Sequence, residues 1–233
     1  MYGLAFNGKH SYNDFGIYLE SKSLQAPSKK KIKVDVPFMN GSYDFSTVGS
    51  GGEIVYNQRE IVVKFGIPSR SKETLYSIYS DILQWLLDMG KSQLIFDDID
   101  DYYFLAEVES ISSFEEVLRF GRFEAKFVAE PFKISVDYVG ADIWDTFNFL
   151  EDITQYNEFD IIGTKLIKLY NIGRAVAPII TVNSNMSIII SGKSYNLLVG
   201  DNNIFGLKLQ NGDNWITVNG NGHIKISFKK VRL

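Results

Sequence analysis

Histidine is the side chain best suited to proton transfer near neutral pH, and this sequence has two, His10 and His223. They stand 213 positions apart, in separate segments that we expect to be β, and neither has an acidic or hydroxyl partner at a recognisable spacing. The absence of cysteine removes thiolate nucleophiles and cysteine zinc sites. The sequence therefore predicts turn or surface histidines and a protein that is not an enzyme, with no catalytic, metal or cofactor residues.

Two further groups of residues have alternative interpretations. Asp97, Asp98, Asp100 and Asp101 could bind calcium, but the EF-hand spacing is missing, so a charged hairpin tip is the preferred interpretation. The segment 191–194, SGKS, resembles the end of a phosphate-binding loop. That motif needs a glycine five positions before Gly192, where this chain has serine, and a helix after it, where this chain has a strand pattern.

Aromatic side chains give two candidate binding surfaces. Trp144 and Trp215 could stack on sugar rings, with a core position as the alternative, and they support a carbohydrate-binding module as the second functional hypothesis. The glycine-rich stretch 37–53 includes Phe38, Met39, Tyr43 and Phe45, which we expect either to fold back as a hairpin or to meet a partner surface. Those four residues are the predicted oligomer interface. The lysines at 29–31 just before it are expected to lie in a solvated loop.

These residues must be positioned by strands and one principal helix. Apolar residues recur at three- and four-residue steps over 71–89, which predicts an amphipathic helix starting near Ser71 and ending at Gly90. Elsewhere the pattern alternates with period two, so we expect a mainly β protein. The expected strands are 2–6, 15–19, 32–36, 54–65, 93–96, 102–110, 123–127, 161–170, 179–182, 186–190, 195–199, 215–218 and 222–228.

The chain of 233 residues is expected to divide near Pro131 to Gly140 into a β domain with one helix (1–132) and a β-sandwich (133–233). The first carries 14 basic and 19 acidic residues, a net −5, and the second 10 and 9, a net +1. The overall charge of −4 argues against a nucleic-acid partner. The sequence shows no signal peptide and no apolar run long enough to cross a membrane. Residues 141–158 match neither period.

The order of these elements resembles the distal tail proteins of long-tailed, non-contractile bacteriophages and prophages. The resemblance covers about 130 residues of the first domain and depends on an ordered set of motifs, with no single diagnostic one. The motifs are DFGI at 14–17, VP at 36–37, NGSYDF at 40–45, the helix ending in WL at 85–86, the 94–98 stretch and the strand 123–131, with LYNIG at 169–173 and API at 177–179 in the second domain.

The resemblance implies a structural virion protein in which six copies form a ring through the first domain. That ring would join the tail tube protein to the tail-associated hub, lysin or tail-tip protein, and to a receptor-binding protein, at the virion tail tip after assembly in the host cytoplasm. The second domain would be a galectin-like sandwich. It lacks the His-x-Asn-x-Arg and Trp-Gly-x-Glu signatures of galectins, so sugar binding does not follow from the fold.

Overall fold

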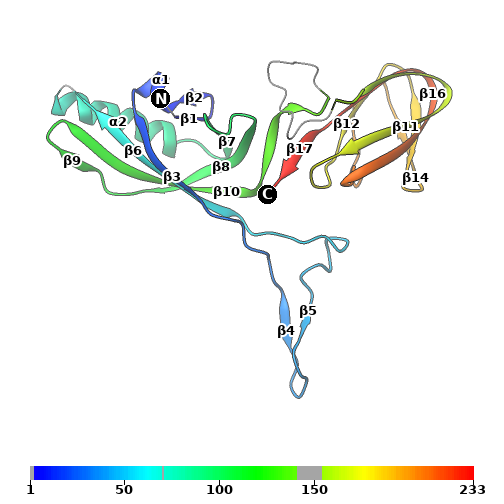
Figure 1. The fold of residues 1–233 in the computed structure, drawn as a ribbon, viewed down its shortest axis with the longest axis horizontal. Helices are drawn as coiled ribbons and strands as arrows, with labels where there is room; N and C mark the ends of the chain where they lie inside the picture. Colours follow the sequence, from blue (N-terminus) through cyan, green and yellow to red (C-terminus); the bar gives the residue numbers. More distant parts are fainter. Residues whose placement is uncertain (1–2, 70, 141–153) are drawn as a thin grey trace. The chain divides into compact units, whose positions relative to one another are not determined.

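The protein consists of two compact units in the computed structural model, which describes residues 3–69, 71–140 and 154–233 (Figure 1). The first unit is Met1–Lys133 with Leu233, and the second is Ile134–Arg232. The mainly β class predicted from the sequence is confirmed. Each unit has its own buried apolar cluster.

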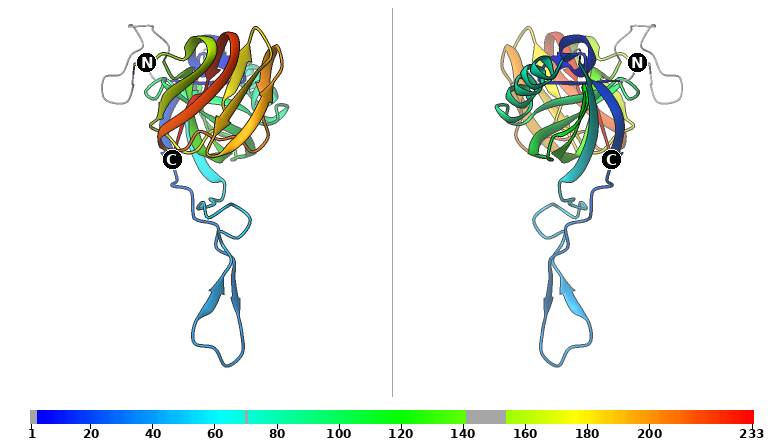
Figure 2. Two further views of the ribbon diagram at one scale, coloured as in Figure 1. Left: turned by 90° about the vertical axis from the view of Figure 1, so that its right-hand side faces the viewer. Right: turned by 90° about the vertical axis from the view of Figure 1, so that its left-hand side faces the viewer.

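The first unit is a twisted antiparallel sheet with one long helix on one face (Figures 1 and 2). The strand order is β2-β1-β7-β8-β10-β6-β3, and β9 pairs with β10. The bounds are β1 Leu4–Phe6, β2 Lys9–His10, β3 Tyr18–Leu24, β6 Arg59–Pro68, β7 Ser92–Phe96, β8 Tyr102–Ile111, β9 Glu115–Val117 and β10 Phe120–Tyr138. In β6 and β10 the buried residues alternate with wetter ones, as expected for a sheet with one covered face.

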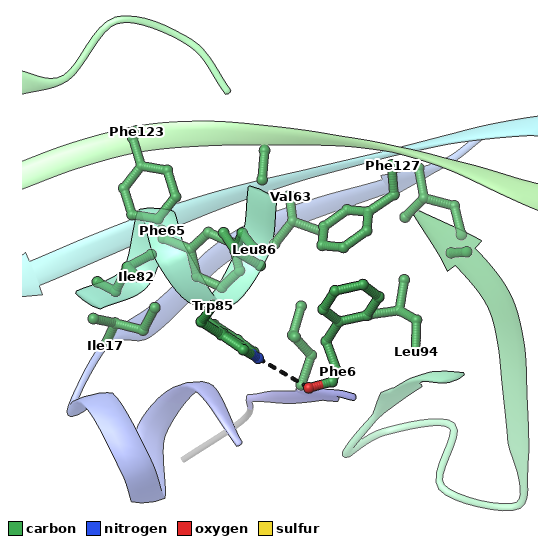
Figure 3. Close-up of a cluster of buried hydrophobic side chains, with 14 of the residues drawn as sticks. Phe6, Ile17, Val63, Phe65, Ile82, Trp85, Leu86, Leu94, Phe123 and Phe127 are labelled. Carbon is green, nitrogen blue, oxygen red and sulfur yellow. Dashed lines mark hydrogen bonds between the residues drawn. The ribbon is translucent and has the colours of Figure 1, made fainter. Parts of the chain in front are cut away.

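Helix α2, Lys72–Leu87, covers that face. It begins as predicted, because the Ser71 hydroxyl accepts the Thr74 N–H at 3.2 Å. It ends earlier than predicted, at Asp88, whose backbone is right-handed, so the expected left-handed cap at Gly90 is wrong. Trp85 is fully packed against Phe6, Phe15 and the sheet, and its Nε1–H donates to the Phe6 carbonyl at 2.9 Å (Figure 3).

Three predicted boundaries of the first unit are wrong. Residues 11–15 form a short helix, α1 (Ser11–Phe15), where a strand was expected to start. Strand β6 starts at Arg59 and not at Ile54. Pro131 does not end β10, which continues to Tyr138. Pairing of β10 with β6 stops at Ala129, so the missing N–H of Pro131 costs no hydrogen bond to β6.

The second unit is a strongly curved antiparallel sheet that encloses its own core. Its strands are β11 Glu158–Asn171, β12 Ile179–Val182, β13 Met186–Ile190, β14 Lys193–Leu197, β15 Gly200–Asn203, β16 Gly212–Ser227 and β17 Lys229–Arg232. The order in its sheet is β14-β13-β16-β12-β15, with β11 also on β16, while β17 pairs with β10 of the other sheet. The two strands predicted at 215–218 and 222–228 are one continuous strand, β16.

Paired glycines explain how one strand serves both halves of this unit. Gly163 of β11 lies opposite Gly220 of β16, and both have positive φ angles. The first half of β16 pairs with β13 and the second half with β12. Glycine tolerates the sharp bend between the halves, so two layers form without a break in the chain.

Candidate assembly interface

The outstanding surface feature of the first unit is an arm, residues 25–58, which leaves the sheet between β3 and β6 (Figures 1 and 2). Its first part is a narrow pair of extended segments, held by the Lys30 N–H to the Val55 carbonyl at 2.9 Å and the Asn57 N–H to the Ser28 carbonyl at 2.8 Å. Beyond this stem lies a two-stranded ribbon, β4 (Lys33–Asp35) and β5 (Ser42–Asp44).

The register of the ribbon sorts its side chains onto two unlike faces. Val34 lies opposite Tyr43, and the Phe45 N–H donates to the Ile32 carbonyl at 2.8 Å. Because side chains alternate along a strand, one face is formed by Ile32, Val34, Val36, Tyr43 and Phe45. We call this the apolar face. The rings of Tyr43 and Phe45 have centroids 6.1 Å apart, as expected for neighbours on one face.

The opposite face of the ribbon is charged, and Asp44 is paired within it. Lys33 lies opposite Asp44, and Asp35 opposite Ser42. Asp44 accepts the Ser46 N–H at 2.9 Å and pairs with the Lys31 ammonium at 3.3 Å. Hydrogen bonds from Ser46 are the main cause that lowers the pKa of Asp44 to about 2. The polar groups of this face therefore need no partner protein, because they bond to one another or to water.

The apolar face, in contrast, is left exposed to water by the described residues. All five of its side chains are exposed, and Phe38 at the tip is 110% exposed with a φ of +67°. A bulky apolar residue in the left-handed region is both strained and wet, a combination that marks functional sites. An isolated two-stranded ribbon is only marginally stable, so this one would gain stability from a partner. An uncovered apolar face of this kind is typical of an interaction surface.

The structure brings three of the four predicted interface residues to the surface of the arm. Phe38, Tyr43 and Phe45 are exposed, and Met39 is partly buried. Of the two alternatives for this stretch, the hairpin is the one observed. Ile32, Val34 and Val36 belong to the same face and were missed as interface residues, although their alternation with lysine and aspartate was visible in the sequence.

Both histidines have acidic partners that sequence spacing did not reveal. Nε2 of His10 is 3.0 Å from Asp97, while its Nδ1 accepts the Tyr12 and Asn13 N–H groups and so caps α1. Nδ1 of His223 is 3.0 Å from Asp160. The partners lie 87 and 63 positions away, so only the fold brings them together. The sequence showed no partner at a recognisable spacing, and the partners that the structure shows lie at no such spacing.

The aspartate cluster lies in the turn between β7 and β8, at the predicted hairpin tip. Asp97 accepts the Gly3 N–H at 2.6 Å, and Asp98 pairs with Lys22. In the described part of the chain, no three acidic or histidine side chains group closely enough to hold a metal ion. Over the same residues, no helix is both long and apolar enough to cross a bilayer.

Trp215 lies on the outer face of β16 and is 54% exposed, so a core position is wrong for this tryptophan. The Lys168 ammonium is 5.4 Å from its ring, and Leu166 and Ile189 are exposed on the same sheet. Trp144, the other predicted stacking residue, lies outside the described residues.

Comparison with known proteins gives the family. The model for the phage tail protein RIFT-related domain matches residues 9–129, which is 121 of 233 residues. The chain therefore belongs to this family of phage tail proteins, and the predicted resemblance is confirmed.

One solved structure agrees with this assignment at the level of fold. The crystal structure of the Dit protein (gp 19.1) of phage SPP1, described as a paradigm of the hub adsorption apparatus in phages infecting Gram-positive bacteria, matches with a TM-score of 0.65. The sequences are 11% identical, and all of both chains is covered. A chain of the phage P2 baseplate in its activated conformation with calcium matches with a TM-score of 0.47 at 9% identity, over 98% and 97% of the two chains. The search of curated proteins finds no match.

Proposed function

We propose that this chain is a non-enzymatic structural component of the distal tail or baseplate that self-associates into a ring through its arm. The observation that carries the proposal is the uncovered apolar face of the ribbon. Family membership and the Dit-like fold support a tail role, and the arm supplies a means of assembly. A ring of six copies is the expected form.

A closed ring fits the arm better than a two-fold dimer does. The arm is one projecting element with a single apolar face, and it can lie on a different surface of the next copy. Such heterologous contacts close into a ring when the rotation between copies permits. Each copy then gives one arm and receives one, so every apolar face is covered.

The same proposal places the ring between other tail proteins. We expect the tail tube protein on one side and the hub, lysin or tail-tip protein on the other, with a receptor-binding protein as a further partner. The site of action would be the virion tail tip, after assembly in the bacterial host cytoplasm. Nucleic acid and membrane lipid are not expected partners.

Native mass spectrometry of the full chain from 1 to 100 µM tests the ring directly. We expect a hexamer that becomes predominantly monomer in the double variant Val34→Ser, Tyr43→Ser. The matched control is Lys33→Ser, Ser42→Ala on the opposite face of the same ribbon, which should keep the hexamer. A wild-type protein that stays monomeric across this range, also with the tail tube protein added, would contradict the proposal.

A second candidate is saccharide binding by the second unit, favoured by the exposed indole of Trp215. The Lys168 ammonium lies near the Trp215 ring, and the part of the indole that it leaves exposed could stack on a sugar. A glycan array with the full chain should then give hits that Trp215→Ala removes. An array without specific hits, or hits unchanged in the variant, would reject this candidate.

A further inference from the structure

Arg59 is a buried cation without a counter-ion among the described residues. It starts β6 on the core face of the sheet and is only 8% exposed. Its Nε–H has no hydrogen-bond acceptor within the part of the chain that the structure describes. Among the described residues, no carboxylate forms an ion pair with Arg59. The contact that its guanidinium does make is with an aromatic ring. Buried arginines are ordinarily paired, so this arrangement calls for an explanation.

The strand order shows how the guanidinium reaches its position. Arg59 is opposite Ala129 of β10, and β10 lies between β6 and β8. The small alanine lets the long side chain cross β10, and the guanidinium carbon lies 5.3 Å from the ring centroid of Phe104 on β8. Stacking on an aromatic face offsets part of the desolvation cost of the guanidinium, but the ring gives its N–H groups no hydrogen-bond acceptor.

A second cation lies on the same face. The Lys133 ammonium is 4.3 Å from the ring centroid of Tyr102. Tyr102 and Phe104 are two residues apart on β8, so their rings stand about 7 Å apart along the strand. Lys133 likewise forms no ion pair with a carboxylate in the described part of the chain. Two cations thus lie over two adjacent rings, and no described carboxylate pairs with either of them.

Other cations of this unit do form ion pairs with carboxylates. Lys22, whose ammonium lies over Phe96, pairs with Asp98, and Lys126 pairs with both Glu60 and Glu109. Burial lowers the pKa of Arg59, the direction expected for a desolvated cation that no anion compensates. An unpaired buried charge destabilises the fold, and a hydrogen-bonded partner anion offsets part of that cost.

We propose that Arg59 and Lys133 form an anion site that binds a carboxylate carried by a second copy of this chain. The proposal deepens the ring proposed above and rests on it. The site lies at the root of the arm, where the Gln25 N–H donates to the Glu60 carbonyl at 3.0 Å just before the stem begins. It is therefore continuous with the surface we assign to assembly, and the acidic excess of the chain supplies carboxylates on every copy.

The chemistry of the site is tested first in a protein that cannot assemble. In the Val34→Ser, Tyr43→Ser protein, the Arg59 Nε–H resonance is followed by NMR as sodium acetate replaces sodium chloride at constant ionic strength. We expect a saturable shift with a millimolar midpoint. Arg122, which pairs with Glu20 on the wet face of the sheet, is the matched control and should not respond. An Arg59 resonance that ignores acetate would overturn the anion site.

Two substitutions then separate an assembly role from a structural one. In the monomeric background, Arg59→Met removes an uncompensated charge, and we expect the melting temperature to rise by about 2–8 °C. In the wild-type background, the same substitution should weaken ring formation at least tenfold, and Arg59→Lys should restore it in part. A fall in melting temperature of the monomer, or an unchanged ring, would overturn the proposal.

The two proposals fail differently. If the wild-type chain forms no ring but acetate still shifts Arg59, the ring is wrong and the second copy is excluded as the source of the carboxylate. If the ring forms and Arg59→Met leaves its dissociation constant unchanged, the ring stands and the carboxylate contact is wrong.

Discussion

At the scale of single residues, backbone strain coincides with exposed apolar side chains. In residues 3–69, 71–140 and 154–233, four non-glycine residues have positive φ, and two of them, Asn7 and Ser191, are small polar residues suited to turns. The other two are Phe38 and Leu118, which are 110% and 82% exposed. Neither strain nor exposure helps the isolated chain, so both residues point to contacts made in the assembled state.

Phe38→Gly separates folding from assembly at the arm tip. Glycine accepts a φ of +67° without steric cost, so the stability of the monomeric chain should be unchanged or slightly higher. Ring formation should weaken by about tenfold or more, because the exposed ring is lost. Urea denaturation and native mass spectrometry measure the two effects, with Phe205→Ser on the second unit as the control. Equal ring stability in wild type and Phe38→Gly would contradict the assigned role.

Asp44 provides a pH test of the ribbon. Its pKa is lowered to about 2, so the contribution of its hydrogen bonds is fully present above pH about 4 and is lost as the pH falls through about 2. Carbon-detected NMR titration should give that midpoint. Ser46→Ala removes the hydroxyl but keeps the backbone N–H, and should raise the pKa part of the way to 3.8. A wild-type midpoint near 3.8 would show that the Ser46 contacts do not persist in solution.

Sequence reasoning at this scale found apolar and aromatic candidates but missed paired charges. Phe38, Tyr43 and Phe45 could be chosen because aromatic residues among glycines are unusual for a surface loop. The acidic partners of His10 and His223 could not be identified from the sequence, because strand pairing brings together residues that are far apart in the chain. Arg59 lies within the predicted strand 54–65, in step with Ile61 and Val63, but an arginine is so rarely buried that the sequence alone did not mark it as a core-face residue.

At the scale of elements, the helix was the most predictable part, because its period, length and serine cap agree. The early end of α2 was not predictable, since a glycine near a helix end permits a left-handed cap without requiring one. Pro131 was misleading for a related reason. A proline ends a strand only where its N–H would have been needed, and that depends on where pairing with β6 stops.

Trp85 fixes α2 to the first strand, and Trp85→Phe isolates the hydrogen bond. The substitution keeps an aromatic ring but leaves the buried Phe6 carbonyl without its donor (Figure 3). We expect a loss of about 1–3 kcal/mol in the free energy of unfolding, plus a smaller packing loss. Urea denaturation followed by circular dichroism measures it. Tyr76→Phe, on the exposed side of the same helix, should cost less than about 1 kcal/mol, and equal losses in both variants would contradict the anchoring role.

At the scale of the whole molecule, the two units share one strand in sequence but have separate cores. β10 runs from the first unit through Lys133, and its last residues contact β17 of the second. The Lys230 N–H donates to the Ser135 hydroxyl at 2.9 Å, and the Val139 N–H to the Phe228 carbonyl at 2.9 Å. The sequence placed the boundary near Pro131 to Gly140, but it could not show that the last residues of β10 pair with β17 inside the second unit.

This arrangement predicts which fragment of the second unit folds alone. Residues 134–233 keep Ser135 and the buried Val139, so we expect a cooperative thermal transition in scanning calorimetry. Residues 140–233 lose the contacts to β17, and burial of Val139 alone contributes about 1.5–3 kcal/mol, so this fragment should melt at least 5 °C lower or remain unfolded. If both fragments melted at the same temperature, the end of β10 would be dispensable. If 134–233 showed no transition while the full chain did, the second unit would depend on the first, and the division into two independently folding domains would be wrong.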